Sequence, residues 1–362
     1  MSQQSNSLSQ LALQKFKKDF WGVFSLGFIV FIGLISIFAY VIAPDNSQYA
    51  NQMHLSIHSK KPGFAVQMLT IPQQSEIEQS FLSNVFFGKK IQDTEIPITA
   101  YSIQNNTLSY TEYASDGLEG LTKSIGMNGL SEHELISNKT FLFGTDKYGR
   151  DLLSRILVGA RISFFIGFIA VFISLVIGIF MGSVAGYFGG RVDTIIMWFI
   201  NVSWSIPTLL LVIAITLALG KGFWQVFIAV GLTMWVEVAR VVRGQVMGVK
   251  EMQYVTAARA LGFNDFRIIT KHILPNIMAP VIVISAANFA AAILIESGLS
   301  FLGIGAQPPM ASWGAMIKDH YNYIILGKPY LALIPGFCIM SLVMAFMLMG
   351  NALRDALDVK SS

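Results

Sequence analysis

Six long apolar runs are the feature that most constrains the fold of this chain. Each is about 20 residues long or longer, which is enough for an α-helix to cross the hydrocarbon core of a bilayer. Lipid offers no water to unpaired backbone N–H and C=O groups, so such runs have to be helical. The runs cover approximately residues 21–43, 162–187, 194–219, 223–242, 277–302 and 330–350. The sequence therefore predicts an all-α membrane protein with six transmembrane helices.

Composition supports this class. The 362 residues are 54% hydrophobic and only 13% charged, whereas soluble domains carry about 25% charged residues. The first run follows Lys15, Lys17 and Lys18 and is 23 residues long, too long for the core of a cleavable signal peptide. We therefore interpret it as a first transmembrane helix. One cysteine, Cys338, excludes an intrachain disulfide.

The distribution of Lys and Arg predicts the orientation, because cytoplasmic segments carry an excess of positive charge. With six spans, the N-terminal segment, residues 243–276 and the C-terminal tail fall on one side. Their basic residues are Lys15, Lys17, Lys18, Arg243, Lys250, Arg259, Arg267, Lys271, Arg354 and Lys360. The opposite short segments contain Lys221, Lys318 and Lys328. We expect both termini in the cytoplasm and the segment from about 44 to 160 outside.

The outer segment is polar and alternates in character. "IPITAYSIQNNTLSYTEY" alternates apolar and polar residues on either side of Asn105-Asn106, which indicates a β-hairpin. "FAVQMLTI" (64–71) is a second candidate strand. We therefore expect a small β-containing extracytoplasmic insertion at 44–140, between the first helix (1–43, with the N-terminus) and a core at 141–362.

Glycine and proline residues within the spans predict close helix contacts and kinks. Gly178, Gly182 and Gly186 are spaced by four, so they form a small-residue ridge that lets helices approach closely. This ridge is a static packing face or one that slides during transport. Pro207 and Pro335 each remove a backbone hydrogen bond inside a span and predict kinks.

Charged residues in lipid are costly and face a cavity or a partner. Glu237 and Arg240 are three residues apart on one helical face, so we expect an ion pair near the inner end of the fourth span. Glu296 lies near the outer end of the fifth span. Two interpretations of it stay open: a cap for the following loop, or a role in the pathway or its gating.

The most informative stretch is "YVTAARALGFNDFRIITKHILPN" (254–276) between two spans. It predicts two short amphipathic helices hinged at Gly262, because Gly favours the left-handed conformation that ends helices. Asn264 or Asp265 is suited to cap the second helix, and we expect Pro275 to end it. Ala-Ala and nearby Phe residues, surrounded by cations, suit a compact docking element, although an interfacial helix pair has the same pattern.

No phosphate-binding loop of the G-x-x-x-x-G-K-[ST] type occurs in the sequence. We find no hydrolase or metalloprotease motif either. The sequence thus predicts a chain that is not an enzyme, with no cofactor or metal of its own and no nucleic-acid partner.

"TAARALG" followed by "HILPN" resembles the EAA loop of ABC-importer permeases, with Thr256 in place of the usual Glu. Three further stretches resemble dipeptide, oligopeptide and nickel permeases of the C type. They are "FGTDKYGRDLLSRILVGARISFFIG" (143–167), "AGYFGGRVD" (185–193) and "ESGLSFLGIGAQPPMASWGAMI" (296–317). The resemblance covers residues from about 141 onward and the first span, but not the insertion.

This resemblance implies the type I importer permease fold and a multi-pass subunit of the bacterial inner membrane. It implies a homologous second permease forming a heterodimer within the lipid, two P-loop ATPase subunits that bind ATP, and an extracytoplasmic substrate-binding protein. The expected ATPase-coupling residues are Thr256, Ala257, Ala258, Leu261, Gly262, Phe263 and Pro275, within the loop 243–276. A structural or gating role near the outer face is expected for Gly144, Asp146, Gly149, Arg150 and Asp151.

Two rival functions stay open on the sequence alone. One is a self-sufficient secondary transporter or channel, and the other is a membrane anchor for an outer interaction module. The EAA-like loop and the five further spans favour the importer permease, and the resemblance favours peptides as its substrate. Nickel or another small solute remains an alternative, and the sequence assigns no role to the insertion.

Overall fold

The computed structural model describes residues 8–72, 80–90, 93–114, 120–127, 129–220 and 222–357. The basic residues Lys221 and Lys360 lie outside the described residues. The chain forms two compact units: Met1–Ile32, Ser163–Gln307 and Phe337–Ser362 in one, and Gly33–Ile162 with Pro308–Gly336 in the other. The elements are α1 (Leu8–Lys18), α2 (Phe20–Ile37), α3 (Ala39–Ile42), η1 (Leu55–Ile57), β1 (Phe64–Ile71), α4 (Phe81–Phe87), β2 (Thr94–Gln104), β3 (Thr107–Glu112), β4 (Thr122–Gly126), α5 (Glu132–Leu135), β5 (Ile136–Phe141), α6 (Leu152–Phe188), α7 (Gly190–Ser205), α8 (Thr208–Leu219), α9 (Phe223–Val249), α10 (Gln253–Ala260), α11 (Asp265–Arg267), η2 (Ile268–Ile273), α12 (Leu274–Phe301), α13 (Trp313–His320), η3 (Tyr321–Ile324) and α14 (Tyr330–Leu357).

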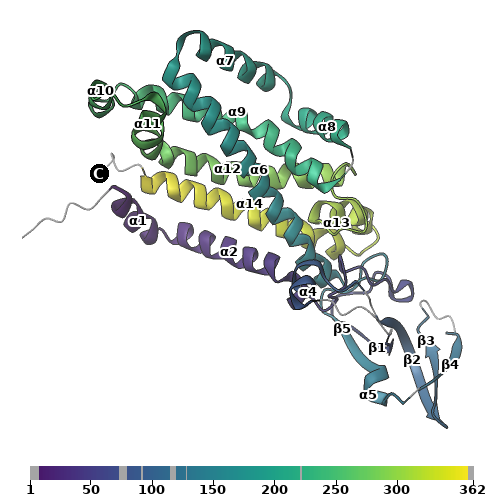
Figure 1. Ribbon diagram of the computed structural model, residues 1–362. Helices are drawn as coiled ribbons and strands as arrows, with labels where there is room; N and C mark the ends of the chain where they lie inside the picture. The colour runs from purple at the N-terminus through teal and green to yellow at the C-terminus, as the bar shows by residue number, and fades with distance from the viewer. Residues whose placement is uncertain are drawn as a thin grey trace, which may run out of the picture. The chain divides into compact units, whose positions relative to one another are not determined.

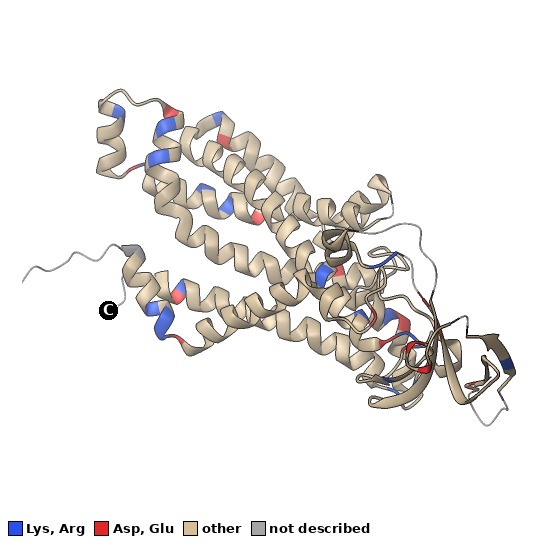
Figure 2. Cartoon of the chain, turned by 60° about the horizontal axis from the view of Figure 1, so that its bottom comes forward, with Lys and Arg blue, Asp and Glu red and all other residues tan. Residues whose placement is uncertain are grey.

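The first unit is a bundle of apolar helices. In the described part of the chain, five helices are long and apolar enough to cross a membrane, and the bent pair α7–α8 brings the total to six if it counts as one span. Within this unit α1, α10 and the end of α14 lie at one end of the bundle (Figure 1), where Phe16 of α1 packs against Ala352 and Ala356 of α14. Figure 2 shows that the Lys and Arg residues of this helical bundle gather toward that end. The prediction of a helical membrane protein is confirmed.

Two predicted spans have different boundaries from those expected. The helix α6 has 37 residues and is about 55 Å long at 1.5 Å per residue, so it extends well beyond a hydrocarbon core of about 30 Å. It starts ten residues earlier than expected because the Asp151 carboxylate accepts the backbone N–H of Ser154 at 2.8 Å and caps it. The first run is interrupted at Phe38, after which the short helix α3 packs Ala39 and Tyr40 into a cluster with Val158.

The third span is broken rather than merely kinked. The axes of α7 and α8 differ by 94° across the short break between Ser205 and Thr208. Ile206 adopts an extended conformation, with φ −95° and ψ 129°, because the ring of Pro207 disfavours a helical residue before it. Pro335, by contrast, lies inside the uninterrupted helix α14.

The glycine ridge of α6 lies against α9. A Cβ atom at Gly182 would be 2.5 Å from the carbonyl oxygen of Ala239 and 2.8 Å from Cβ of Val242. Gly178 and Gly186 face Val238 and Val246 in the same way, one turn to either side. Only glycine permits this backbone separation, so the spacing of four in the sequence corresponds to one ridge of contact.

The second unit contains an antiparallel five-stranded sheet with the order β4-β3-β2-β1-β5. The hairpin β2–β3 turns at Asn105 and Asn106, whose φ angles of 46° and 58° suit a type I′ turn. Alternate side chains, among them Leu69, Ile98 and Leu108, form a buried cluster on one face. The predicted β-containing insertion and its hairpin are confirmed.

Candidate coupling segment and outer polar network

The segment between α9 and α12 is anchored to the bundle by its apolar side. Val255 and Ala258 of α10 are buried in one cluster with Val246 of α9, Ile268 of η2 and Ile277 of α12. Short helices in isolation are marginal, so this packing is what holds α10 in place. The result is a compact helical element fixed at both of its ends.

A tight turn separates α10 from the next helix. Gly262 has φ 78°, its N–H donates to the carbonyl of Arg259 at 3.0 Å, and the N–H of Phe263 donates to the carbonyl of Ala258 at 3.2 Å. Asn264 then caps the next helix, because its side-chain oxygen accepts the N–H of Arg267 at 2.8 Å. The hinge predicted at Gly262 is confirmed, and the choice between Asn264 and Asp265 as cap is decided for Asn264.

The expectation that Pro275 ends the second short helix is wrong. Asp265–Phe301 is one continuous helical stretch that includes the span. A π-helical turn, η2, precedes Pro275, and the N–H of Leu274 donates to the carbonyl of Ile269, five residues back. Proline lacks an N–H and its ring clashes with the carbonyl four residues earlier, so a widened turn accommodates it without breaking the helix.

Polar contacts tie the segment to the end of α6. The Tyr187 hydroxyl donates to Oδ1 of Asp265 at 2.6 Å, and the Arg259 guanidinium lies 5.7 Å from the centre of the Tyr187 ring. Arg267 stacks over Phe263 at 4.2 Å. The segment is therefore attached to α6 as well as to α9 and α12.

The outward surface of the segment differs from the one predicted. Thr256, Ala257 and Leu261 are exposed, Leu261 by 74% of its surface. Ala258, by contrast, is 4% exposed and packs inward, so it does not lie on the outward surface, and its role in coupling stays a prediction. Phe263 is half-buried and Pro275 is exposed.

Phe266 was not among the expected coupling residues, yet it lies on the exposed surface of this segment. It is 76% exposed, more than any other large apolar side chain of this segment. Its neighbour Phe263 is covered by the Arg267 guanidinium, which the sequence alone does not reveal. Leu261 and Phe266 are two strongly exposed apolar side chains close to Gly262 in the sequence, outside any long apolar run, and are called the exposed apolar pair below.

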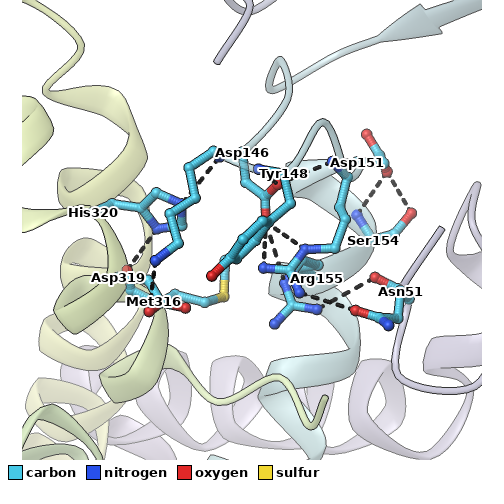
Figure 3. Close-up of polar contacts among 12 residues, drawn as sticks. Asn51, Asp146, Tyr148, Asp151, Ser154, Arg155, Met316, Asp319 and His320 are labelled. Atoms are coloured by element: carbon cyan, nitrogen blue, oxygen red, sulfur yellow. Dashed lines mark hydrogen bonds and ion pairs between the residues drawn. The ribbon is translucent and has the colours of Figure 1, made fainter. Parts of the chain in front are cut away.

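The predicted outer cluster forms a buried charged network in the second unit (Figure 3). Asp146 is fully buried, and its Oδ2 accepts Nε of Arg150 at 2.7 Å while Oδ1 accepts the backbone N–H of Tyr148 at 2.8 Å. Arg150 also donates to Oδ1 of Asn51 at 2.9 Å. Arg155 lies 3.8 Å from Asp146. The cluster joins residues far apart in the sequence, so it holds this unit together.

Two glycines of the cluster allow close backbone contact. Gly144 and Gly149 have φ 77° and 75°. A Cβ atom at Gly144 would collide with the carbonyl of Lys60, and one at Gly149 with the carbonyl of His54.

Asp151 is the second carboxylate of the cluster. Burial raises the pKa of the Asp151 carboxyl, an effect that the hydrogen bonds from Ser154 oppose. These residues build a folded turn, and the structural interpretation of them has direct geometric support.

His320 of α13 extends the same network. Its Nε2 accepts the backbone N–H of Lys147 at 3.4 Å, and its Nδ1–H donates to the carbonyl of Met316 at 2.7 Å. Only a neutral imidazole can make both bonds. Burial lowers the pKa of His320 in keeping with this role.

Glu296 is 1% exposed in α12. Its Oε1 accepts the hydroxyl of Ser300 at 2.7 Å, and the same hydroxyl accepts the N–H of Ala306 at 3.2 Å. Ser163 of α6 also donates to Oε2 at 3.5 Å. This geometry favours the role of Glu296 as a support for the loop after α12.

The expected ion pair between Glu237 and Arg240 is absent from the described residues. Arg240 instead stacks on the Trp204 ring, 3.6 Å from its centre, and donates to Oδ1 of Asn201 at 3.2 Å. The packing of α7 against α9 brings these partners to Arg240, and the sequence does not show which helices are neighbours.

Long apolar helices, a broken span and a fixed cationic helical segment together define a multi-pass membrane protein. The family described as "Binding-protein-dependent transport system inner membrane component" matches residues 174–360. The "N-terminal TM domain of oligopeptide transport permease C" matches residues 7–62. The chain therefore belongs to the family of binding-protein-dependent transport system inner membrane components.

Relatives agree with this assignment. The dipeptide transport system permease protein DppC of Bacillus subtilis (strain 168) is 44% identical over 237 residues, which are 66% of this chain and 74% of that protein. The oligopeptide transport system permease protein OppC of the same organism is 41% identical, over 62% of this chain and 73% of that protein. The glutathione transport system permease protein GsiD of Pectobacterium atrosepticum is 40% identical, over 60% and 72% respectively.

Proposed function

We propose that this chain is one half of a translocation pathway that imports short peptides, driven by ATP hydrolysis in separate subunits. The relatives are named for dipeptide, oligopeptide and glutathione transport, and glutathione is itself a peptide. These names favour a peptide over nickel. A second, homologous permease supplies the other half of the pathway, and an extracytoplasmic binding protein delivers the substrate.

The observation that carries the coupling role is the exposed apolar pair of Leu261 and Phe266. Both expose about three quarters of their surface on an element whose other face is fixed to α9 and α12. Two protruding apolar side chains on a fixed element, close to Ala257 in the sequence, suit insertion into a groove of an ATPase subunit. ATP then binds to that partner, in keeping with the lack of a phosphate-binding loop in this sequence.

The proposal also assigns the chain an orientation in the membrane. Both termini and α10 lie in the bacterial cytoplasm, while the five-stranded sheet lies outside. Lys15, Lys17 and Lys18 in α1 and Arg259, Arg267 and Lys271 in the coupling segment support this orientation through the excess of positive charge expected on the cytoplasmic side.

The docking role is tested by co-purification in mild detergent from the native host, with the chain tagged. Leu261→Glu should lose the ATPase while keeping the second permease, since an exposed side chain changes without disturbing the core. Leu121→Glu, at an equally exposed leucine outside the bundle (67% against 74%), is the matched control and should retain both partners.

Gly262 gives an independent variant pair. Space around its Cβ position is open, so Gly262→Asn keeps the left-handed turn with a small residue. Gly262→Arg adds bulk to the docking face. We expect the Arg variant to lose ATPase binding and the Asn variant to keep it. ATP-independent uptake by a chain that purifies alone would refute the importer assignment in favour of a secondary transporter.

Orientation has its own test. In a Cys338→Ala background, single cysteines at Ser109 in β3 and Gln253 in α10 are treated with a membrane-impermeant maleimide in intact spheroplasts. Ser109→Cys should be labelled and Gln253→Cys should be protected until the membrane is opened. The reverse pattern would contradict the proposed orientation.

A further inference from the structure

A small cavity with a mainly apolar lining and four polar side chains in its wall lies at the break of the third span. Its volume is about 170 Å³, and its walls include Ser203, Thr208, Thr233 and Glu237. These residues come from α7, α8 and α9, all in the first unit. Unpaired backbone groups at membrane depth are tolerated only where they are buried in protein or line a water-filled space. The exposed break at Ser205-Ile206-Pro207 therefore indicates that this side of the chain faces water or a second subunit.

Glu237 is the charged group of this cavity. It lies near the middle of α9 and its side chain is exposed, and no Lys, Arg or His of the described chain forms an ion pair with it. Arg240, the nearest cation along the helix, is occupied by Trp204 and Asn201. A carboxylate within a membrane-spanning helix is costly without a partner, so Glu237 is suited to bind a positively charged group.

The donors around the cavity suit an ammonium group better than a metal ion. Serine and threonine hydroxyls beside one carboxylate accept the N–H donors of an ammonium group. The described residues contain no cluster of three His, Cys, Asp or Glu side chains that could hold a metal. The first turn of α8 begins at Thr208 and offers free backbone N–H groups to carbonyl oxygens. One cavity thus presents acceptors for the ammonium of a peptide and donors for its carbonyls.

We propose that Glu237 binds the ammonium group of the transported peptide, in a subsite of the translocation pathway at the α7–α8 break. This inference rests on the proposed import of peptides. The cavity is small beside the roughly 300–1,000 Å³ of whole-ligand sites, so it takes one end or one side chain of the peptide rather than the whole molecule. Both the N-terminal ammonium and a lysine ammonium have the required chemistry.

The test uses the complete complex, with both permeases, the ATPases and the binding protein, in proteoliposomes. ATP-driven uptake of labelled Ala-Ala and Lys-Ala is compared for wild type, Glu237→Gln, which removes the charge at constant shape, and Glu237→Asp, which keeps it. The binding protein is the same throughout, so its own preferences cancel in the ratio of variant to wild type. We expect Glu237→Gln to raise KM about tenfold or more, because a charge-assisted hydrogen bond is lost, and Glu237→Asp to raise it less.

The two peptides distinguish the sources of the ammonium. An equal rise in KM for both peptides assigns the N-terminus, and a rise for Lys-Ala alone assigns the side chain. Unchanged KM for both in Glu237→Gln, with ATP-driven uptake intact, would overturn the subsite and leave the proposed function standing. Loss of the second permease on purification of Glu237→Gln would also overturn it, because Glu237 would then pair with that subunit. Absence of ATP-driven uptake in the wild-type complex would instead overturn the proposed function.

Discussion

Gly182→Ala is the substitution whose cost the structure defines most clearly. The new Cβ would lie 2.5 Å from the carbonyl oxygen of Ala239, and such contacts are essentially never closer than 3.0 Å. The helices α6 and α9 would therefore have to separate by about 0.5 Å or more, in an interior packed as densely as a crystal. The obstructing atom belongs to the backbone, so no change of rotamer relieves the clash.

Two terms of opposite sign set the magnitude. Overpacking a well-packed core costs about 1–3 kcal/mol, while replacing Gly by Ala in a helix gains about 0.5–1 kcal/mol. Gly27 in α2 serves as the matched control, because nothing lies within 4 Å of its Cβ position. Gly27→Ala should show the gain alone, and the difference between the two variants gives the cost of the clash.

The assay is denaturant titration of the purified protein in mixed micelles, followed by far-ultraviolet circular dichroism. Gly182→Ala should unfold with a free energy lower than that of Gly27→Ala by about 1–3 kcal/mol. Adding Val242→Ala should not restore stability, because the carbonyl of Ala239 remains in place. If Gly182→Ala proved as stable as Gly27→Ala, the close approach of α6 and α9 would be refuted.

Three further predictions concern the outer network and the coupling segment. Arg150→Met should lower the free energy of unfolding by about 3–5 kcal/mol, because it removes the closer of the two arginines from the buried Asp146 carboxylate; adding Asp146→Asn should recover part of this loss. The depressed folded-state pKa of His320 stabilises the protein above the unfolded value of about 6.5, and this stabilisation is lost as the pH falls through the folded pKa. The thermal midpoint should thus drop less between pH 7.5 and 5.5 in His320→Gln, and an equal drop would contradict the neutral imidazole. Pro275→Ala restores a backbone N–H, so the π-helical turn can relax to α-helical register; ATPase binding should persist while uptake per ATP hydrolysed falls several-fold, and unchanged coupling would show that this turn has no part in it.

The spans were predictable because hydrophobicity is a local property of the chain. The apolar runs, the hinge at Gly262 and the turn at Asn105-Asn106 each depend on a few neighbouring residues. Lipid permits little except helices across its core, so a run of sufficient length almost determines its structure. The glycine spacing in α6 likewise predicts a ridge of close contact, although it does not say which helix lies opposite.

The tertiary structure decided everything that depends on a partner from elsewhere in the chain. Ala258 and Ala257 are adjacent and identical in the sequence, yet only Ala258 faces the core, because α10 is anchored by Val255 and Ile268. Arg240 pairs with Trp204 rather than Glu237 because α7 packs against α9.

Glu237 shows the same division most clearly. Its charge and its place in an apolar run are visible in the sequence, and they predicted an ion pair with Arg240. The loss of Arg240 as a partner and the cavity beside Thr208 follow only from how three helices meet. The sequence by itself determined which segments cross the membrane, because that depends on local transfer free energy. Which side chains are left without partners there depends on packing between distant segments, so only the tertiary structure decided it.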